Sequence, residues 1–349
     1  MEYTKSEAKL WAKEHLKGLE VPVFPSFTPD LEHLDEDGIR FDVDHIHANG
    51  FTSILAAPEV CGMTFEERKQ FVAIVCDEAR KLKMHRSATV LQDTVEQDIE
   101  MLHHLEKVGA THVTLAHPVQ YYPRSPQDIF HMYKHMCDST GLAITFYPGR
   151  LHTWHFHPSY FPPDVMRCIA DIPNVVAMKV AGGGSVALTV QAFRLCGDRI
   201  LVADPMPDRW FFTVPQYGQQ WAGAGPFYAM QTPENPRMVR LFDLLLIGEV
   251  DKAMDIYWEM SRPGGSSSLA DSYFHTGIVT ALTDKYAHWC AGGNGGTVRQ
   301  PTGRLHDYQK DAIRAGLKSL GITPREPEEE FYVGRVNYAK GYRLKKYEA

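Results

Sequence analysis

The sequence predicts an α/β chain, a (β/α)8 TIM barrel with a C-terminal helical extension. Short apolar runs alternate with longer amphipathic stretches, and eight such runs can be recognised. Runs such as Ile144–Tyr147 and Val175–Met178 show little polar alternation, which is typical of parallel strands covered on both faces. Eight strand–helix units within about 230 residues fit a closed barrel better than an open, doubly wound sheet.

Each unit of this pattern can be given bounds. The predicted strands are Val21–Phe27, Thr52–Ala57, Arg86–Val90, His112–Ala116, Ala143–Tyr147, Val175–Val180, Arg199–Ala203 and Trp221–Phe227. The predicted helices between them are Leu34–Asn49, Thr64–Leu82, Thr94–Val108, Pro126–Thr140, Pro163–Ile169, Ser185–Cys196 and Trp210–Tyr217.

Local signals mark several helix ends. Thr64 with Glu67, and Thr94 with Gln97, have the spacing of a capping box. Gly109 and Gly141 stand where two helices are expected to stop, as glycines at helix C-termini often do.

The chain divides into four parts. Residues 1–19 form an N-terminal helix, 20–234 the barrel, 235–324 a helical extension and 325–349 a charged, Tyr-rich tail. The tail allows two alternatives, because it could wrap around a neighbouring subunit or stay mobile. The expected helices of the extension are Asn235–Gly248, Val250–Met260, Leu269–His288 and Leu305–Leu320, with a Gly-rich loop at Ala291–Thr302.

Composition excludes several classes of function. The chain has 349 residues and a formal net charge of −7, so no global field draws it to nucleic acid or to an anionic membrane. No segment approaches the roughly 18 consecutive apolar residues of a membrane span. The N-terminus lacks the apolar core of a signal peptide, and the six cysteines form no CxxC pair. We therefore expect a cytoplasmic protein with reduced cysteines.

The most informative residue is Lys179, near the end of the apolar run Val175–Val180. Burial lowers the pKa of an amine, and a neutral amine can attack a carbonyl. Catalytic groups of this fold stand at the C-terminal ends of the barrel strands. The alternative is a lysine that extends to the surface from the strand end and pairs with a carboxylate.

Two further residues follow the fifth predicted strand. Tyr147 would lie at the same barrel mouth, where a phenol can shuttle protons, although it could also simply pack there. Arg150, three residues on, could clamp a substrate carboxylate with two parallel hydrogen bonds, or be an ordinary surface arginine.

Together these motifs resemble the dihydrodipicolinate synthase/N-acetylneuraminate lyase family, from about Val21 to Ile322. Ile172-Pro-Asn-Val-Val-Ala-Met-Lys-Val-Ala-Gly resembles its Schiff-base signature, and Ile144–Arg150 its strand-5 motif. Pro118–Gln127 is similar to the stretch after its fourth strand, and Thr64-Phe-Glu-Glu-Arg to one of its helix starts.

The resemblance implies a class I aldolase or related lyase acting on a 2-oxo acid of the pyruvate type. Lys179 would form a covalent imine, so that no separate cofactor and no metal is needed. Tyr147 would transfer protons, and Arg150 would bind substrate. Members commonly form homo-oligomers, so a dimer or a tetramer is expected.

The chain departs from the family pattern at the end of its second strand. Where the family has Gly-Thr-Thr-Gly-Glu, which binds the pyruvate carboxylate, this sequence reads Ala56-Ala57-Pro58-Glu59-Val60. No hydroxyl remains there, and a proline has no N–H. Ala57 and Glu59 occupy the substrate-binding positions, and Gly223, within the predicted eighth strand, is a further candidate.

The proton shuttle is a second departure. Aligned without a gap, the position of the family tyrosine holds Thr145, so Tyr147 takes the role only if the strand end is shifted. If it is not, Tyr121 or Tyr122 could serve, with Tyr122 the catalytic candidate and Tyr121 a substrate-binding one. A third departure is Val180, where the family has an acidic residue.

The loop after strand 5 suggests a bulky partner. Trp154 and His155 could line an enlarged pocket for an aromatic or bulky aldehyde, as in the hydratase-aldolases of this family, or the loop could pack on the extension. The histidines suggest a metal only weakly, because few fall at strand ends. A phosphate at Gly182-Gly183-Gly184 is a weak alternative to a tight turn.

Three functions therefore remain open. The leading one is a lyase that makes or breaks a C–C bond. A dehydratase or decarboxylase would use the same imine with another leaving group. A barrel without catalysis would bind a small molecule only.

Overall fold

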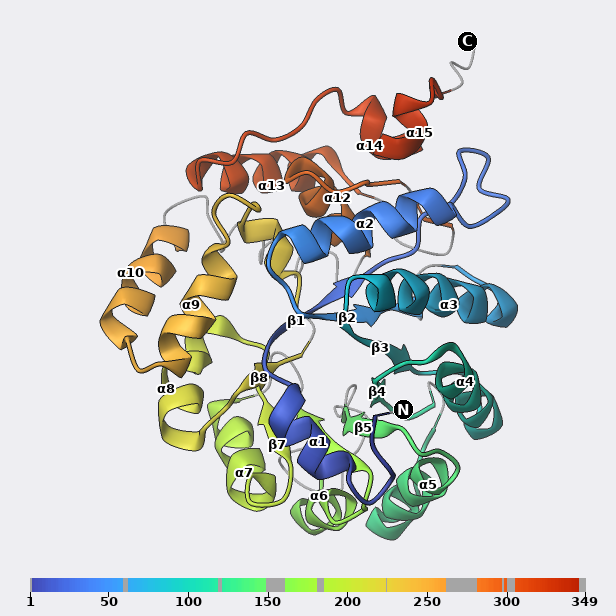
Figure 1. Ribbon diagram of the computed structural model, residues 1–349, viewed down its shortest axis with the longest axis vertical. Coiled ribbons are helices and arrows are strands. Elements are labelled where there is room, and N and C mark those ends of the chain that lie inside the picture. The colour runs from blue at the N-terminus through green and yellow to red at the C-terminus, as the bar shows by residue number, and fades with distance from the viewer. Residues whose placement is uncertain are drawn as a thin grey trace.

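The structure, a computed structural model, describes residues 2–58, 62–118, 121–148, 161–180, 185–223, 225–261, 281–296, 298–299 and 305–344. Within these residues eight parallel strands form one sheet in the order β7-β6-β5-β4-β3-β2-β1-β8. The strands lie at the centre of a ring of helices, as Figure 1 shows. The predicted (β/α)8 barrel with C-terminal helices is confirmed.

The strands have the following bounds: β1 Gly18–Val23, β2 Ser53–Ala56, β3 His85–Val90, β4 His112–Leu115, β5 Ala143–Phe146, β6 Val175–Lys179, β7 Leu201–Ala203 and β8 Trp221–Ala222. The predicted bounds differ most from the structure at β1 and β8, and β7 begins two residues later than predicted. β1 begins at Gly18, where it pairs with Trp221 of β8. It ends at Val23, and the carbonyl of the nearby Pro25 accepts a hydrogen bond from the Lys285 side chain rather than from a neighbouring strand. β8 is short, and the 3-10 helix η3, Phe227–Met230, follows it.

The helices of the ring are α1 Ala8–His15, α2 Glu36–Ala48, α3 Phe65–Lys81, α4 Val95–Val108, α5 Pro126–Asp138, α6 Pro163–Ala170, α7 Val186–Cys196 and α8 Pro207–Tyr217. The capping box of Thr64 with Glu67 is confirmed. At Thr94 only the hydroxyl half of the box forms, with the N–H of Gln97. Gly109 is the expected left-handed cap, but α5 ends three residues before Gly141, with Ser139 as its cap.

Two apolar clusters make up the core. The larger one fills the layer between strands and helices and contains Ile144, Phe146 and Met178. The smaller one lies inside the barrel, where Ala143, Ala177, Ala203 and Trp221 pack against the N-terminal segment. That segment contributes Tyr3, Ala8, Trp11, Ala12 and Leu16. Helix α1 therefore closes the N-terminal end of the barrel (Figure 1).

One side chain links the two strands that end the sheet order. Gln219 accepts a hydrogen bond from the Asp204 N–H (3.3 Å) and donates to the carbonyls of Asp204 (3.0 Å) and Trp221 (3.1 Å). Asp204 follows β7, and Trp221 begins β8. The amide of Gln219 therefore bridges the seam, where no backbone ladder between β7 and β8 is described.

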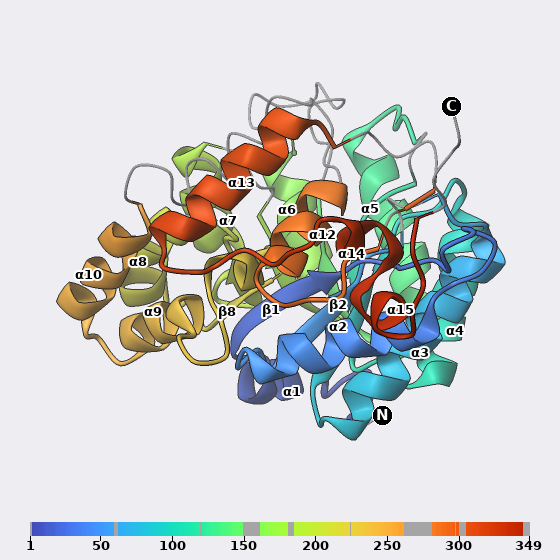
Figure 2. The ribbon, with the colours of Figure 1, turned by 90° about the horizontal axis from the view of Figure 1, so that it is seen from above.

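The extension continues the chain with α9 Arg237–Leu246, α10 Val250–Met260, α12 Ala281–Cys290, α13 Asp307–Ser319, α14 Glu329–Val333 and α15 Arg335–Ala339. α9 packs against α8 and α10, whereas α15 packs against α2 (Figures 1 and 2). The described part of the tail therefore packs on α2 of its own chain.

The cysteines behave as expected in the described part of the chain. Cys76, Cys137, Cys196 and Cys290 are buried free thiols, and Cys168 is free and exposed. Burial raises the pKa of the Cys76 thiol to about 12, which makes this group inert at neutral pH. Cys61 lies outside the described residues.

Candidate active site

Lys179 ends β6 and projects into the barrel. Its neighbours Met178 and Val180 belong to the outer apolar layer, whereas Ala177 belongs to the cluster inside the barrel. Side chains alternate along a strand, so Lys179 shares the inward face with Ala177. The residue is partly buried, and its Cα partner on β7 is Ala203. This placement is the one that carbonyl chemistry at the C-terminal end of a barrel strand requires.

Tyr147 stands beside this lysine. Phe146 pairs with Met178 across β5 and β6, so the next residues, Tyr147 and Lys179, lie at the same level. The Nζ of Lys179 is 5.1 Å from the centroid of the Tyr147 ring. The Tyr147 backbone is fixed from both sides, because its N–H donates to the carbonyl of Leu115 (2.8 Å) and its carbonyl accepts from the Tyr133 hydroxyl (3.4 Å). The structure thus brings together the two residues that the sequence singled out first.

Thr145, the alternative at the position of the family tyrosine, lies one layer deeper. It faces inward, two residues before Tyr147, and is fully buried. Its Cα partner on β6 is Ala177. Its hydroxyl has no hydrogen-bond partner among the described residues. Thr145 and Tyr147 therefore both face the interior, at successive levels.

The two tyrosines after β4 differ in exposure. Tyr121 is partly buried against the core, and burial raises the pKa of its hydroxyl. Its N–H donates to the carbonyl of Pro118 (3.0 Å). Tyr122 is 68% exposed in the single chain. Tyr121 is thus held by the barrel, whereas Tyr122 presents its ring to the surface.

The end of β2 offers few donors. Ala57 is buried, and its N–H already donates to the carbonyl of Val23 (3.1 Å). Pro58 has no N–H, and the next residue, Glu59, lies outside the described residues. Among the described residues at this strand end, Ala57 and Pro58 thus offer no hydroxyl and no unused backbone N–H.

Gly223 has a packing role that the structure makes visible. It follows β8 on the inward face, and a Cβ at this position would lie 2.6 Å from the ring of Trp221. Trp221 fills the lower barrel with Trp11 and Tyr3. A side chain at 223 would therefore displace a ring of the inner cluster, whether or not Gly223 also contacts a ligand.

Arg150, Glu59, Trp154, His155 and the stretch Gly182-Gly183-Gly184 all lie outside the described residues.

Sequence reasoning missed a polar layer near the floor of the barrel. Glu20 on β1 is fully buried and accepts hydrogen bonds from His112 Nε2 (2.8 Å), Ser53 (2.8 Å) and Ser87 (3.1 Å). Burial favours the neutral acid, but His112 and the two hydroxyls outweigh it and lower the pKa of Glu20. The sequence signal for this layer was a single Glu within an apolar strand. Its partners could not be predicted from the sequence because they come from three other strands.

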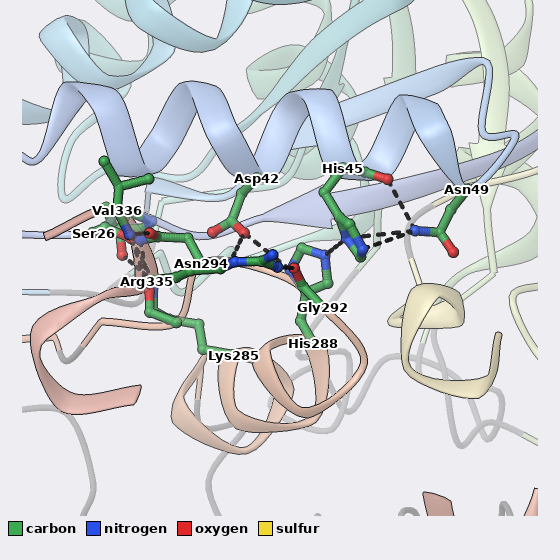
Figure 3. Close-up of polar contacts among 12 residues, drawn as sticks. Ser26, Asp42, His45, Asn49, Lys285, His288, Gly292, Asn294, Arg335 and Val336 are labelled. Atoms are coloured by element: carbon green, nitrogen blue, oxygen red, sulfur yellow. Dashed lines mark hydrogen bonds and ion pairs between the residues drawn. The ribbon is translucent and has the colours of Figure 1, made fainter. Parts of the chain in front are cut away.

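A second polar cluster lies outside the barrel, between α2 and α12 (Figure 3). His288 Nε2 is 2.9 Å from His45 Nδ1, and His288 Nδ1 is 3.4 Å from Asp42. Burial lowers the pKa of each histidine to about 3. Lys285 of α12 donates to the carbonyl of Pro25 (2.8 Å) and to Ser26 (2.9 Å). This cluster therefore holds α12 of the extension against α2 and the segment after β1.

No three His, Cys, Asp or Glu side chains of the described residues gather in a way that could hold a metal ion. None of the described helices has the length and apolarity needed to cross a bilayer.

No protein-family model matches the chain. It is 25% identical over 307 residues to the curated 4-hydroxy-tetrahydrodipicolinate synthase of Methanothrix thermoacetophila, covering 85% of this chain and 96% of the relative. A second such synthase, from Methanopyrus kandleri, is 21% identical over 318 residues, covering 88% of this chain and 98% of the relative.

Solved structures share the fold. The dihydrodipicolinate synthase of Thermotoga maritima matches with a TM-score of 0.72 at 19% identity, covering 88% of this chain and 99% of the other. The N-acetylneuraminate lyase of Fusobacterium nucleatum matches with a TM-score of 0.70 at 17% identity, covering 87% and 99%. The chain is therefore similar, along nearly their whole length, to curated members of the dihydrodipicolinate synthase/N-acetylneuraminate lyase family, and it shares the fold of their solved structures.

Proposed function

We propose that this protein makes or breaks a C–C bond of a 2-oxo acid of the pyruvate type, held as an imine on Lys179. One observation carries the proposal. The amine of Lys179 enters the barrel from the C-terminal end of β6 and lies 5.1 Å from the centroid of the Tyr147 ring. Similarity to the dihydrodipicolinate synthase/N-acetylneuraminate lyase family supports the same chemistry, and the covalent imine takes the place of a separate cofactor.

The steps need only the chain's own groups. The neutral amine of Lys179 adds to the ketone carbon, and the carbinolamine then loses water to form the protonated imine. The imine draws electrons from the adjacent carbon, so that loss of a proton or cleavage of a C–C bond gives the enamine. In the direction of synthesis the enamine attacks an aldehyde, and hydrolysis of the imine returns the lysine.

Proton transfer is assigned to Tyr147, whose ring lies beside the reacting nitrogen. Tyr122 is the second candidate, and its exposure would suit a group that acts on the pocket of a neighbouring subunit. Arg150 is proposed to bind substrate with its guanidinium, and Tyr121, Ala57, Glu59 and Gly223 to line the pocket.

The second substrate is proposed to be an aromatic or bulky aldehyde. Trp154 and His155, in the loop after β5, are the sequence features that support it. A dehydratase or decarboxylase would share the imine but release water or carbon dioxide. Product analysis distinguishes these reactions.

The setting of the enzyme follows from its family and composition. We propose a cytoplasmic homo-oligomer, a dimer or a tetramer, that acts on small molecules and not on nucleic acid. The net charge of −7 supports the last point. Light scattering after size-exclusion chromatography measures the oligomeric state.

The decisive experiment traps the imine. The protein is incubated with pyruvate, reduced with borohydride, digested and analysed by mass spectrometry. The adduct is expected on Lys179 and to be absent from Lys285, a second buried lysine that already donates two hydrogen bonds. Absence of any adduct with pyruvate and with other 2-oxo acids would leave the binding-only barrel as the remaining function.

A further inference from the structure

Three threonines stand in register on the inner face of neighbouring strands. Thr89 of β3 is the Cα partner of Thr114 of β4, and Thr114 is the partner of Thr145 of β5. The row continues to Ala177 of β6, which lies two residues before Lys179. Because residues two apart on a strand share a face, this threonine row forms the layer directly below Lys179 and Tyr147.

Two of the three hydroxyls are buried without a partner. Thr114 is 2% exposed and Thr145 is fully buried, and neither hydroxyl has a hydrogen-bond partner among the described residues. Buried polar groups in folded proteins are hydrogen-bonded as a rule, so each exception needs an explanation.

The layer beneath shows that this barrel can satisfy its inner hydroxyls. Ser53 and Ser87 face the same interior and both donate to Glu20. Among the described residues, the inner-face hydroxyls without a partner are those of Thr114 and Thr145, in the layer next to the candidate nucleophile. The unpartnered polar atoms of the lower barrel are of other kinds, namely Glu20 Oε1 and the indole nitrogens of Trp11 and Trp221. A bound group that accepts hydrogen bonds would complete that layer.

The shortage of donors at the end of β2 indicates that this bound group is the carboxylate of the substrate. A 2-oxo acid carries a carboxylate next to its reacting carbon, and the hydroxyls that the related family places after β2 are absent here. The N–H of Ala57 is already bonded to Val23, and Pro58 has none. The carboxylate therefore needs donors from elsewhere in the barrel, and hydroxyls satisfy this need because they donate to an anionic oxygen.

We propose that the hydroxyls of Thr114 and Thr145 donate hydrogen bonds to the carboxylate of the 2-oxo acid bound on Lys179. These two hydrogen bonds would make the protein bind a keto acid more tightly than an uncharged ketone. This inference rests on the proposed function, because it requires a substrate on Lys179. It reassigns the carboxylate site from the end of β2 to the inner faces of β4 and β5.

The test compares two probes in four proteins. Pyruvate and hydroxyacetone are both methyl ketones, and only pyruvate carries a carboxylate. The concentration that gives half-maximal borohydride trapping on Lys179 is measured for the wild type, Thr114→Val, Thr145→Val and the control Thr213→Val. Thr213 is also a fully buried threonine, but its hydroxyl donates to the carbonyl of Arg209 on α8, away from the barrel interior.

The proposal predicts that each inner variant raises the half-maximal concentration of pyruvate about tenfold or more, because each loses a hydrogen bond to a charged group. Hydroxyacetone trapping stays within about twofold, and Thr213→Val matches the wild type with both probes. Unchanged pyruvate trapping in Thr114→Val and Thr145→Val overturns the proposal, and so does an equal loss for both probes.

The wild type separates this inference from the proposed function. Trapping of hydroxyacetone but not of pyruvate would leave Lys179 reactive and overturn the carboxylate site alone. Trapping of neither probe would overturn the proposed function, and with it this inference.

Discussion

The amine of Lys179 and the ring of Tyr147 leave adjacent strands at the same level, with Nζ 5.1 Å from the ring centroid. A cation above an aromatic face is stabilised by the ring, but a phenol can also move a proton. Replacing only the hydroxyl distinguishes these roles.

Tyr147→Phe is expected to keep the ring contact and to lower kcat about 100-fold or more, because proton transfer to and from the imine is lost. Borohydride trapping on Lys179 should persist. Steady-state kinetics and adduct mass measure the two effects. Tyr122→Phe is the matched variant, and a larger loss of kcat there than in Tyr147→Phe would move the shuttle role to Tyr122.

The unsatisfied inner hydroxyls also predict a gain in stability. Thr145→Val replaces a buried, unpaired hydroxyl with a methyl group of similar size, so the free energy of unfolding should rise by about 1 kcal/mol. Thr213→Val removes a hydroxyl that is hydrogen-bonded and should lower that free energy by a similar amount. Urea unfolding without substrate measures both. A loss of stability in Thr145→Val would show that its hydroxyl is satisfied in the free protein.

The seam between β7 and β8 depends on one amide. Gln219→Ala removes the three hydrogen bonds to Asp204 and Trp221, which lie in a buried setting, and should lower the free energy of unfolding by about 2–4 kcal/mol. Gln70→Ala, on the exposed face of α3, should change it by less than about 0.5 kcal/mol. Equal effects of the two variants in urea unfolding would contradict a bridging role for Gln219.

The raised pKa of Asp98 predicts that mild acidification stabilises the folded protein. Burial raises the pKa of this carboxyl to about 7, although its Oδ1 accepts a hydrogen bond from the N–H of Gln92 (2.8 Å). Because the folded-state pKa lies above the unfolded value, the folded form binds the proton more tightly. The resulting stability is complete below about pH 4 and is lost as the pH rises through about 7.

Asp98→Asn keeps the acceptor without the charge. It should raise the free energy of unfolding by about 1–3 kcal/mol at pH 8 and change it little at pH 4. Urea unfolding at both pH values measures the difference. A gain that is equal at the two pH values would show that Asp98 does not titrate as described.

The stability contributed by His45 and His288, between α2 and α12, depends on pH in the opposite direction. The pKa of His45 and of His288 is lowered to about 3, so the unfolded chain takes up protons between pH 6.5 and 3 while the folded chain does not. Stability from this pair is present above pH 6.5 and is lost as the pH falls. Lys285, Tyr228 and Asp42 face the pair, and Asp42, whose pKa burial raises, opposes the loss.

The expected slope is about 1.4 kcal/mol per pH unit for each histidine well below pH 6.5. His288→Gln removes one titrating group and should flatten the curve by about that amount. Urea unfolding at pH 7, 6, 5 and 4 gives both curves. Parallel curves for the two proteins would mean that His288 is protonated in the folded state.

The sequence by itself determined the fold class and singled out Lys179, which the structure has at the end of β6. Eight apolar runs with helices between them allow few arrangements, and a lysine that ends such a run must face either the interior or the helices. Strand ends were less well determined, since β1 and β8 are bounded by their mutual pairing and by Lys285, which lies about 260 residues along the chain from Pro25.

The tertiary structure alone decided which groups meet. Thr89, Thr114 and Thr145 are separated by long stretches of sequence, and only the register of β3, β4 and β5 aligns their hydroxyls. Whether a hydroxyl is paired depends on atoms from other strands, as Ser53 and Ser87 show by sharing Glu20. A local pattern fixes which face a side chain occupies, but hydrogen bonding inside a barrel is set by strands that close around it.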